Sequence, residues 1–166
     1  MKITLDDNNI VFTSDLHLNH RKLCTSYEDH FDRTRKYATI DEMNADIEKQ
    51  WNDVVNDETT VFFLGDFTLG TPGSKLVDLF REYYTKLHFK HMYWLMGNHD
   101  HEIFKKLSKV IEEFPKVTLV RDNHILLTHN GKISKVDDCF CHTSDHYRCI
   151  FLFFGVTTFK NDRISN

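Results

Sequence analysis

The chain has 166 residues, enough for one domain with a substantial core, and 40% of its residues are hydrophobic. A net charge of −4 gives no general positive field for binding nucleic acid, and no apolar run is long enough to cross a membrane. We expect a single domain over residues 1–166. Because the sequence shows no signal-peptide pattern and its four cysteines form no C-x-x-C pair, we expect a cytoplasmic protein with free thiols.

The first predicted elements are two short strands and a helix. Residues 2–5 and 10–14 read as short strands on either side of a cluster of turn-forming residues, which predicts a β-hairpin. Further on, Thr39 fits a helix N-cap and Glu42 completes a capping box. The helical face that follows is apolar and should cover one side of a sheet. Its members are Met43, Ile47, Trp51, Val54 and Val55.

The middle of the chain alternates strands and helices. Residues 60–64 and 91–96 read as strands, and between them Ser74 is the expected N-cap of a second helix. Leu76, Phe80, Tyr83 and Leu87 share one face of that helix. A third helix is predicted over 102–114, ended by Pro115. This alternation is typical of a layered α/β domain.

The last third of the chain is read as mostly β. Residues 117–120 and 125–128 predict a second hairpin across the polar residues between them. The tail, 130–166, is the atypical part of the domain. Within it, 149–154 is expected to be a buried strand, and 156–159 another.

Polar residues follow four of the predicted strands at the point where each ends. Gly97-Asn98-His99-Asp100 comes directly after the apolar run 91–96. Ligand sites of α/β sheets tend to lie at the carboxyl ends of strands. The other strand-end residues are Asp15 and His17, Asp66, and His129. Four strands that each deliver a potential metal ligand favour a site over a set of polar turns.

These side chains form a mixed oxygen and nitrogen ligand set, which suits Mn, Fe, Zn, Ni or Co. Two such ions can activate water and clamp a phosphoryl group in line. His99 follows Asn98 directly and should lie at the rim, where it could give a proton to the leaving oxygen. Asp100 is expected to orient the His99 imidazole.

The four blocks Asp15-x-His17, Gly65-Asp66, Gly97-Asn98-His99-Asp100 and His129 resemble, in order, those of the calcineurin-like metallophosphoesterase superfamily. The resemblance implies an α/β fold with a four-layer αββα arrangement, a β-sandwich flanked by helices. It also implies two divalent ions, with Mn²⁺ the first choice. Asp15 and His17 would bind one ion, Asp66 would bridge, Asn98 and His129 would bind the other, and His99 would be the catalytic acid.

The short first loop, 14–20, resembles that of the small phage and bacterial members, in which His20 and Arg21 would face the substrate. The resemblance implies a phosphoesterase that hydrolyses a phosphomonoester or phosphodiester through a metal-bound hydroxide. A small or nucleotide-type substrate fits a compact chain, no membrane partner is expected, and nucleic acid stays open as a substrate.

The chain departs from the family by lacking the G-H-x-H motif that completes both metal shells. His142 and His146 are the nearest candidates, but their spacing differs from the motif. The alternative hypothesis is therefore a degenerate member, a non-catalytic scaffold that binds metal or a partner. A structural zinc site is a weaker alternative, because its ligands would not form the usual closely spaced pairs. Those ligands would be Cys139, Cys141, His142, His146 and Cys149.

Overall fold

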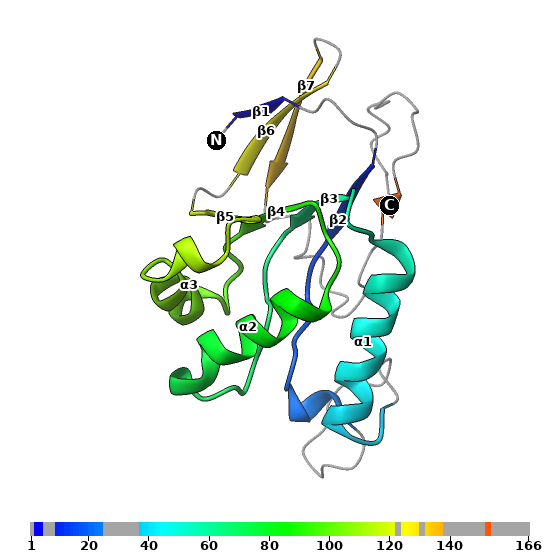
Figure 1. Cartoon of the computed structure of the whole chain (residues 1–166), viewed down its shortest axis with the longest axis vertical. Helices are drawn as coiled ribbons and strands as arrows, with labels where there is room; N and C mark the ends of the chain where they lie inside the picture. The colour runs from blue at the N-terminus through cyan, green and yellow to red at the C-terminus, as the bar shows by residue number, and fades with distance from the viewer. Residues whose placement is uncertain are drawn as a thin grey trace, which may run out of the picture.

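The computed structural model describes residues 2–4, 9–24, 37–121, 124–129, 132–137 and 152–153, and gives only the backbone path from residue 124 onward. Two sheets and three α-helices make up this part of the chain (Figure 1). The strands are β1 (Lys2–Thr4), β2 (Ile10–Thr13), β3 (Thr60–Phe63), β4 (His91–Leu95), β5 (Val117–Val120), β6 (His124–His129), β7 (Lys132–Asp137) and β8 (Leu152–Phe153). The helices are α1 (Ile40–Val54), α2 (Leu76–Lys86) and α3 (His101–Leu107), with 3-10 turns at Arg21–Leu23, Gly73–Lys75 and Ile111–Glu113.

The larger sheet has the strand order β5-β4-β3-β2-β8. Strands β2 to β5 are parallel to their neighbours, and β8 pairs antiparallel with β2. A parallel strand needs a crossover to reach its neighbour, and each of α1, α2 and α3 serves as one. The smaller sheet, β1-β6-β7, pairs β1 parallel with β6 and β6 antiparallel with β7.

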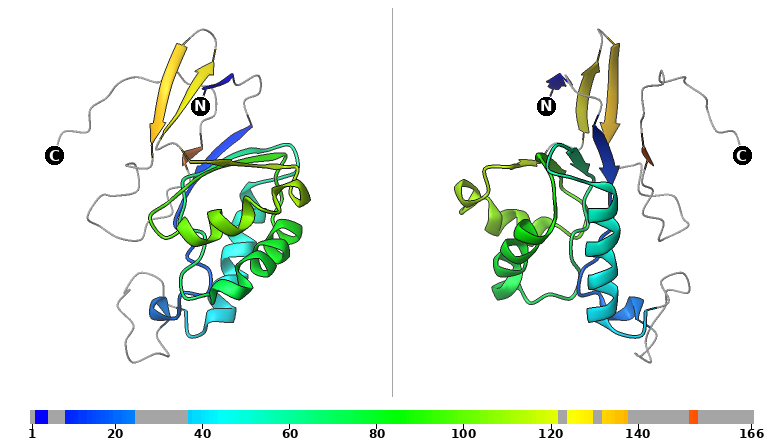
Figure 2. Two further views of the ribbon diagram at one scale, coloured as in Figure 1. Left: turned by 90° about the vertical axis from the view of Figure 1, so that its left-hand side faces the viewer. Right: turned by 45° about the vertical axis from the view of Figure 1, so that its right-hand side comes forward.

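The larger sheet is apolar on both faces, and the strand alternation sorts its side chains between two cores. Val61 and Phe63 of β3 belong to the core beneath the helices, whereas Phe62 packs with Ile3 of the smaller sheet. Figure 2 shows the helices on one side of the larger sheet and β6 and β7 on the other. The expected α/β sandwich is confirmed, and three of its four layers, αββ, lie within the described residues.

The start of α1 confirms Thr39 as the N-cap and differs from the predicted capping box in one bond. The Glu42 backbone N–H donates to Thr39 Oγ1 at 3.1 Å, and the Ala38 N–H donates to Glu42 Oε2 at 2.8 Å. The carboxylate thus bonds one residue before the N-cap instead of the N-cap itself. The predicted apolar face is also confirmed, because Met43 and Trp51 are fully buried beneath it.

Two helix boundaries differ from the predictions. Ser74 is not the N-cap of α2, because Gly73–Lys75 form a 3-10 turn and the helix begins at Leu76. The third helix is shorter than predicted, since α3 ends at Leu107. There the Lys109 and Val110 N–H groups donate to carbonyls three residues back, which tightens the chain and ends the α-helical ladder. Phe114, the last residue of the predicted helix, is buried but follows the 3-10 turn at Ile111–Glu113.

Both predicted hairpins are wrong, because each pair of runs divides between the two sheets. Residues 10–13 pair with β3 and β8, and residues 2–4 pair with β6. Likewise β5 is an edge of the larger sheet, while β6 lies in the smaller one. Of the expected strand 149–154, only Leu152–Phe153 lies within the described residues, and 156–159 lies outside them.

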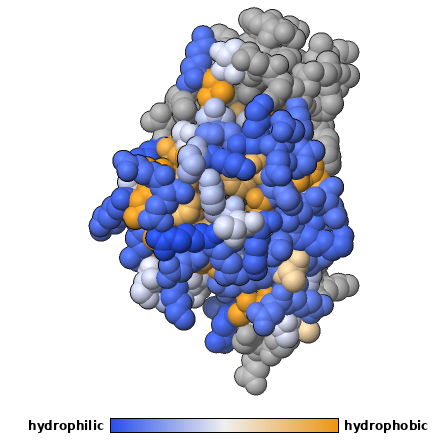
Figure 3. Space-filling model, in the orientation of Figure 1, coloured by the Kyte–Doolittle hydropathy of each residue, from blue (hydrophilic) through white to orange (hydrophobic). Residues whose placement is uncertain are grey.

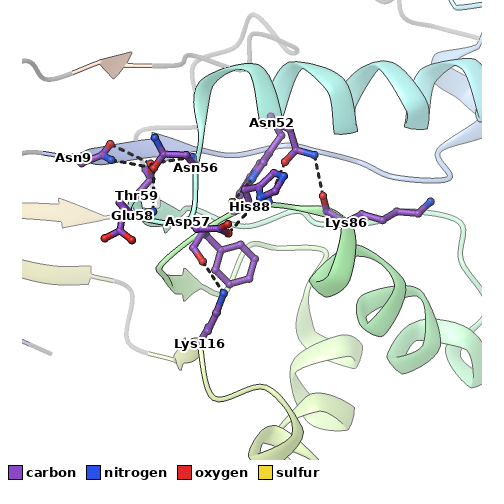
Figure 4. A network of polar contacts seen from close by, with 11 residues as sticks. Asn9, Asn52, Asn56, Asp57, Glu58, Thr59, Lys86, His88 and Lys116 are labelled. Carbon is purple, nitrogen blue, oxygen red and sulfur yellow. Dashed lines mark hydrogen bonds and ion pairs between the residues drawn. The ribbon is translucent and has the colours of Figure 1, made fainter.

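Polar side chains join the loops at the amino ends of β2, β3 and β4 (Figure 4). Thr59 Oγ1 lies 3.1 Å from Asn9 Oδ1 and 3.0 Å from Asn56 Oδ1. Asn52 of α1 clamps the next loop, because its Nδ2 donates to the Lys86 carbonyl and its Oδ1 accepts from the His88 N–H. These contacts connect the loops at the amino ends of the strands, at the edge of the sheet opposite the strand-end residues.

The outer face of the helices is mainly hydrophilic, with hydrophobic residues exposed only in small separate areas of the view in Figure 3. In the part of the chain that the structure describes, none of the helices is both long and apolar enough to span a bilayer.

His91, half-buried at the start of β4, is expected to make the fold more stable at neutral than at acidic pH. Its ring lies 2.9 Å from Thr118 Oγ1, and burial lowers its pKa below the usual value. The folded chain therefore binds this proton less tightly than the unfolded chain, so the stabilisation present above about pH 6.5 is lost as pH falls through the lowered pKa.

Urea unfolding at pH 7 and pH 5 measures this effect. We expect the wild type to lose more stability between the two pH values than His91→Gln does. His88→Gln, at an exposed histidine paired with Asp57, is the control and should behave as the wild type. An equal loss in the wild type and His91→Gln would contradict the prediction.

Candidate metal centre

Three neighbouring parallel strands of the larger sheet deliver the strand-end residues to one edge. Asp15 follows β2, Asp66 follows β3 and Asn98 follows β4. The first two loops stay paired beyond their strands. The Asp15 N–H donates to the Gly65 carbonyl at 2.9 Å, and the His17 N–H donates to the Asp66 carbonyl at 3.0 Å. This ladder fixes the two ligand-bearing loops against each other.

Asp15, His17 and Asp66 form a candidate metal-binding group. One ligand atom from each lies within 4.8 Å of the others. His17 Nε2 is 3.3 Å from Asp15 Oδ1 and 3.8 Å from Asp66 Oδ2. The side chains of His17 and Asp66 are 8% and 11% exposed and that of Asp15 is 24% exposed, so water screens the Asp66 carboxylate less than that of Asp15. An imidazole nitrogen between two carboxylates is a suitable donor set for a divalent transition metal.

All three of these residues have a left-handed backbone. The φ angles are +57° at Asp15, +49° at His17 and +62° at Asp66, and Asn19 follows with +63°. This conformation is unfavourable for residues with a Cβ, and such residues cluster at functional sites. The fold therefore maintains strain at the residues that carry the candidate ligands.

Asn98 and His99 occupy the exposed turn after β4. The His99 N–H donates to Asp66 Oδ1 at 3.0 Å, which ties this turn to the ligand group. The ring centroids of His99 and His17 are 5.9 Å apart, edge to face. The structure therefore places the His99 imidazole beside the metal-binding group and in contact with solvent, at the rim.

Asp100 turns inward, and its carboxylate accepts four hydrogen bonds. Oδ2 accepts from the Trp94 indole at 2.9 Å and from the Asp66 and Gly97 N–H groups at 2.8 and 3.0 Å. Oδ1 accepts from the Phe67 N–H at 3.1 Å. Burial raises the pKa of Asp100, and the four donors act against that rise. None of these donors is the His99 ring, so the geometry favours a role in holding the loops, and a catalytic role stays a prediction.

Gly65 and Gly97 let the loops after β3 and β4 cross in close contact. A Cβ on Gly97 would collide with Asp66 Oδ1, and one on Gly65 would collide with the Gly97 backbone. Gly65 also has a φ of +101°, which favours glycine. The two glycines are therefore what allows Asp66 to approach the His99 turn.

The residues present fit a divalent ion. Asp15 and Asp66 place two negative charges around one imidazole, and like charges this close are stabilised when a cation lies between them. Without an ion, a proton on His17 Nε2 donates to Asp15 Oδ1, 3.3 Å away. The tautomer that suits a bound ion carries its proton on Nδ1, which is buried and has no hydrogen-bond partner among the described residues. This arrangement leaves Nε2 free to donate its lone pair to a metal.

Comparison with known families agrees with this geometry. The family model for calcineurin-like phosphoesterases matches residues 9–163. The chain belongs to the calcineurin-like phosphoesterase family. This family is generally one of hydrolases and uses divalent metal ions, and the group Asp15, His17 and Asp66 is the corresponding candidate metal site.

One curated relative is an uncharacterized protein of Methanocaldococcus jannaschii, which is 33% identical over 103 residues. The match covers 62% of this chain and 52% of the relative, so the chain spans about half the length of the curated relative that it matches. No solved structure matches the chain significantly.

Two sets of predicted residues fall outside this geometry. His129 ends β6, as expected, but β6 belongs to the smaller sheet and its side chains are not among those described. His142 and His146 lie outside the described residues, as do three of the four cysteines.

His20 and Arg21 follow the loop that carries Asp15 and His17, and the His20 ring centroid lies 5.5 Å from that of His17.

Proposed function

We propose that the protein is a metal-dependent phosphoesterase that hydrolyses a phosphomonoester or phosphodiester at a dinuclear site. The group Asp15, His17 and Asp66 carries the proposal, because it brings two carboxylates and an imidazole together on strained loops beside a solvent-facing histidine. Asn98 and His129 are proposed as ligands of the second ion. Mn²⁺ is the proposed metal, and Fe, Zn, Ni and Co are alternatives with the same ligand preferences.

The residues of the chain divide the work. When bound, divalent ions supply Lewis acidity, which activates water at neutral pH and neutralises charge on a phosphoryl group. Asp15, His17 and Asp66 would bind a divalent ion at one edge of the larger sheet. His99, which is exposed at the rim, is proposed to give a proton to the leaving oxygen of the substrate. Its N–H bond to Asp66 Oδ1 keeps that imidazole next to the metal-binding group.

Replacing His99 tests the proposed acid. We expect wild-type protein to hydrolyse bis-p-nitrophenyl phosphate when supplied with Mn²⁺, and His99→Gln to lose about 10²- to 10⁴-fold in turnover. Because the side chain is exposed, the free energy of unfolding should change by no more than about 0.5 kcal/mol. The measurement is p-nitrophenolate release across substrate concentrations, with thermal unfolding of both proteins.

A matched control is His101→Gln, at an exposed histidine two positions further along. It should keep wild-type turnover. Absence of Mn²⁺-dependent turnover in the wild type, or turnover that His99→Gln leaves unchanged, would overturn the proposed reaction.

The missing G-H-x-H motif favours a second candidate function, a scaffold that binds metal or a partner without catalysis. A wild-type chain that binds Mn²⁺ with no turnover of any phosphoester supplied would support this candidate. If the substrate is nucleic acid instead of a small phosphoester, binding should weaken steeply with salt concentration.

A further inference from the structure

A chain of asparagine and threonine side chains links the ligand loops to α1. Asn44 of α1 binds Asn19 in both directions. Its Oδ1 accepts the Asn19 backbone N–H at 3.2 Å, and its Nδ2 donates to Asn19 Oδ1 at 2.7 Å. Asn19 lies two residues after His17, in the loop that carries Asp15 and His17. The helix α1 is therefore hydrogen-bonded to this ligand loop next to His17.

The contacts continue from Asn19 to the loop that carries Asp66. Asn19 Nδ2 donates to Thr71 Oγ1 at 2.9 Å, and the hydroxyls of Thr71 and Thr68 lie 2.8 Å apart. Thr68 Oγ1 donates to the Leu18 carbonyl at 2.7 Å. With Thr71 donating to Thr68, each hydroxyl in the series donates once and accepts once, which is a fully satisfied network.

We propose that Asn44 and Asn19 are positioning residues for the metal centre, and that they hold the ligand loop in its left-handed conformation. This inference rests on the proposed function, because it assigns these residues to the same site. Asn19 has a φ of +63°, which asparagine tolerates better than most residues. Its side chain and its N–H are both bonded, so the network opposes relaxation of the strained residues Asp15 and His17.

Asn52 on the same helix provides a matched control. Like Asn44 it is half-buried and accepts one backbone N–H while its amide nitrogen donates once, but it clamps the loop before β4 at the opposite edge of the sheet (Figure 4). Replacing either residue by alanine removes two equivalent hydrogen bonds from α1. Of the two residues, only Asn44 contacts the ligand loop, so only the replacement of Asn44 should weaken metal binding.

Titration calorimetry with Mn²⁺ alone tests the proposal. We expect Asn44→Ala to bind Mn²⁺ about tenfold more weakly than wild type, as is common when a contact behind a ligand is lost. Asn52→Ala should stay within about twofold. Asn19→Gly keeps the freedom to adopt a positive φ while it removes the side-chain bonds, and it should weaken binding as Asn44→Ala does.

Hydrogen exchange in the absence of metal gives an independent readout. The Leu18 N–H donates to the Phe67 carbonyl, and this amide should exchange faster in Asn44→Ala and Asn19→Gly than in Asn52→Ala. If Asn44→Ala does not fold, Asn19→Gly carries the test. Wild-type affinity in both variants, or an equal loss in Asn52→Ala, would overturn the positioning role and leave the proposed function standing. A wild-type chain that binds no Mn²⁺ would overturn both.

Discussion

Asp66→Asn is expected to reduce Mn²⁺ affinity and phosphoester turnover by more than about a hundredfold each, a larger effect than the loss of a contact behind a ligand. Asparagine keeps the size of the side chain, tolerates the φ of +62°, and can still accept the His99 N–H. The substitution therefore removes one charge and little else. Elemental analysis after Mn²⁺ loading and desalting should give two ions per wild-type chain, and one or none in the variant.

The Asp66→Asn variant should lose Mn²⁺ affinity without losing stability in its metal-free form. In the absence of metal, Asp15 and Asp66 repel each other near the His17 ring, so removing one charge relieves that repulsion. We expect metal-free Asp66→Asn to unfold at a temperature equal to or above that of metal-free wild type. A large fall in unfolding temperature would mean that Asp66 supports the fold itself, and the loss of activity would then not report on the metal site.

Asp100→Ala is expected to cause the largest loss of stability among the site residues. Asp100 is fully buried, and its removal leaves the Trp94 indole and three backbone N–H groups without their acceptor. Each buried donor left unsatisfied costs about 1–3 kcal/mol, so we expect a loss of about 4 kcal/mol or more. Urea unfolding with linear extrapolation measures the change.

Asp100→Asn separates the loss of acceptors from the loss of volume. Its amide oxygen can replace Oδ2 and keep three of the four bonds, whereas its amide nitrogen would face the Phe67 N–H, so we expect a destabilisation smaller than that of Asp100→Ala. Asp57→Ala, at an exposed carboxylate, is the control and should change stability by no more than about 0.5 kcal/mol. An Asp100→Ala variant as stable as wild type would show that the four hydrogen bonds contribute little.

The parts of the structure that could be predicted are those in which local sequence decides the outcome. The Thr39 N-cap and the apolar runs of β3 and β4 are local signals, and the structure contains all three. The strand ends were also predictable, because a parallel sheet brings the residues after β2, β3 and β4 to one edge. Strand pairing was not, since β1 and β2 are adjacent in sequence and belong to different sheets.

Within the site, residue type was more informative than sequence neighbourhood. Asp100 follows His99, which suggested that it orients the imidazole, but the turn directs its carboxylate to Trp94 and the backbone of the neighbouring loop. No sequence pattern distinguished Asn44 as a residue of the site. On the sequence it is one more polar residue of an amphipathic helix, as is Asn52, and only the fold shows which end of the sheet each one contacts.

The division of strands between the two sheets also sets an order of assembly. The larger sheet grows by crossovers that join strands following one another from β2 to β5, and only β8 is added to it from a distant part of the described chain. The smaller sheet requires Lys2–Thr4 to find β6 across most of the chain, and contacts between such distant segments form slowly. Asp15, His17 and Asp66 depend only on the first kind of contact. The metal-binding group therefore belongs to the part of the protein that can form early, so an ion bound there would stabilise a partly folded chain before the sandwich closes.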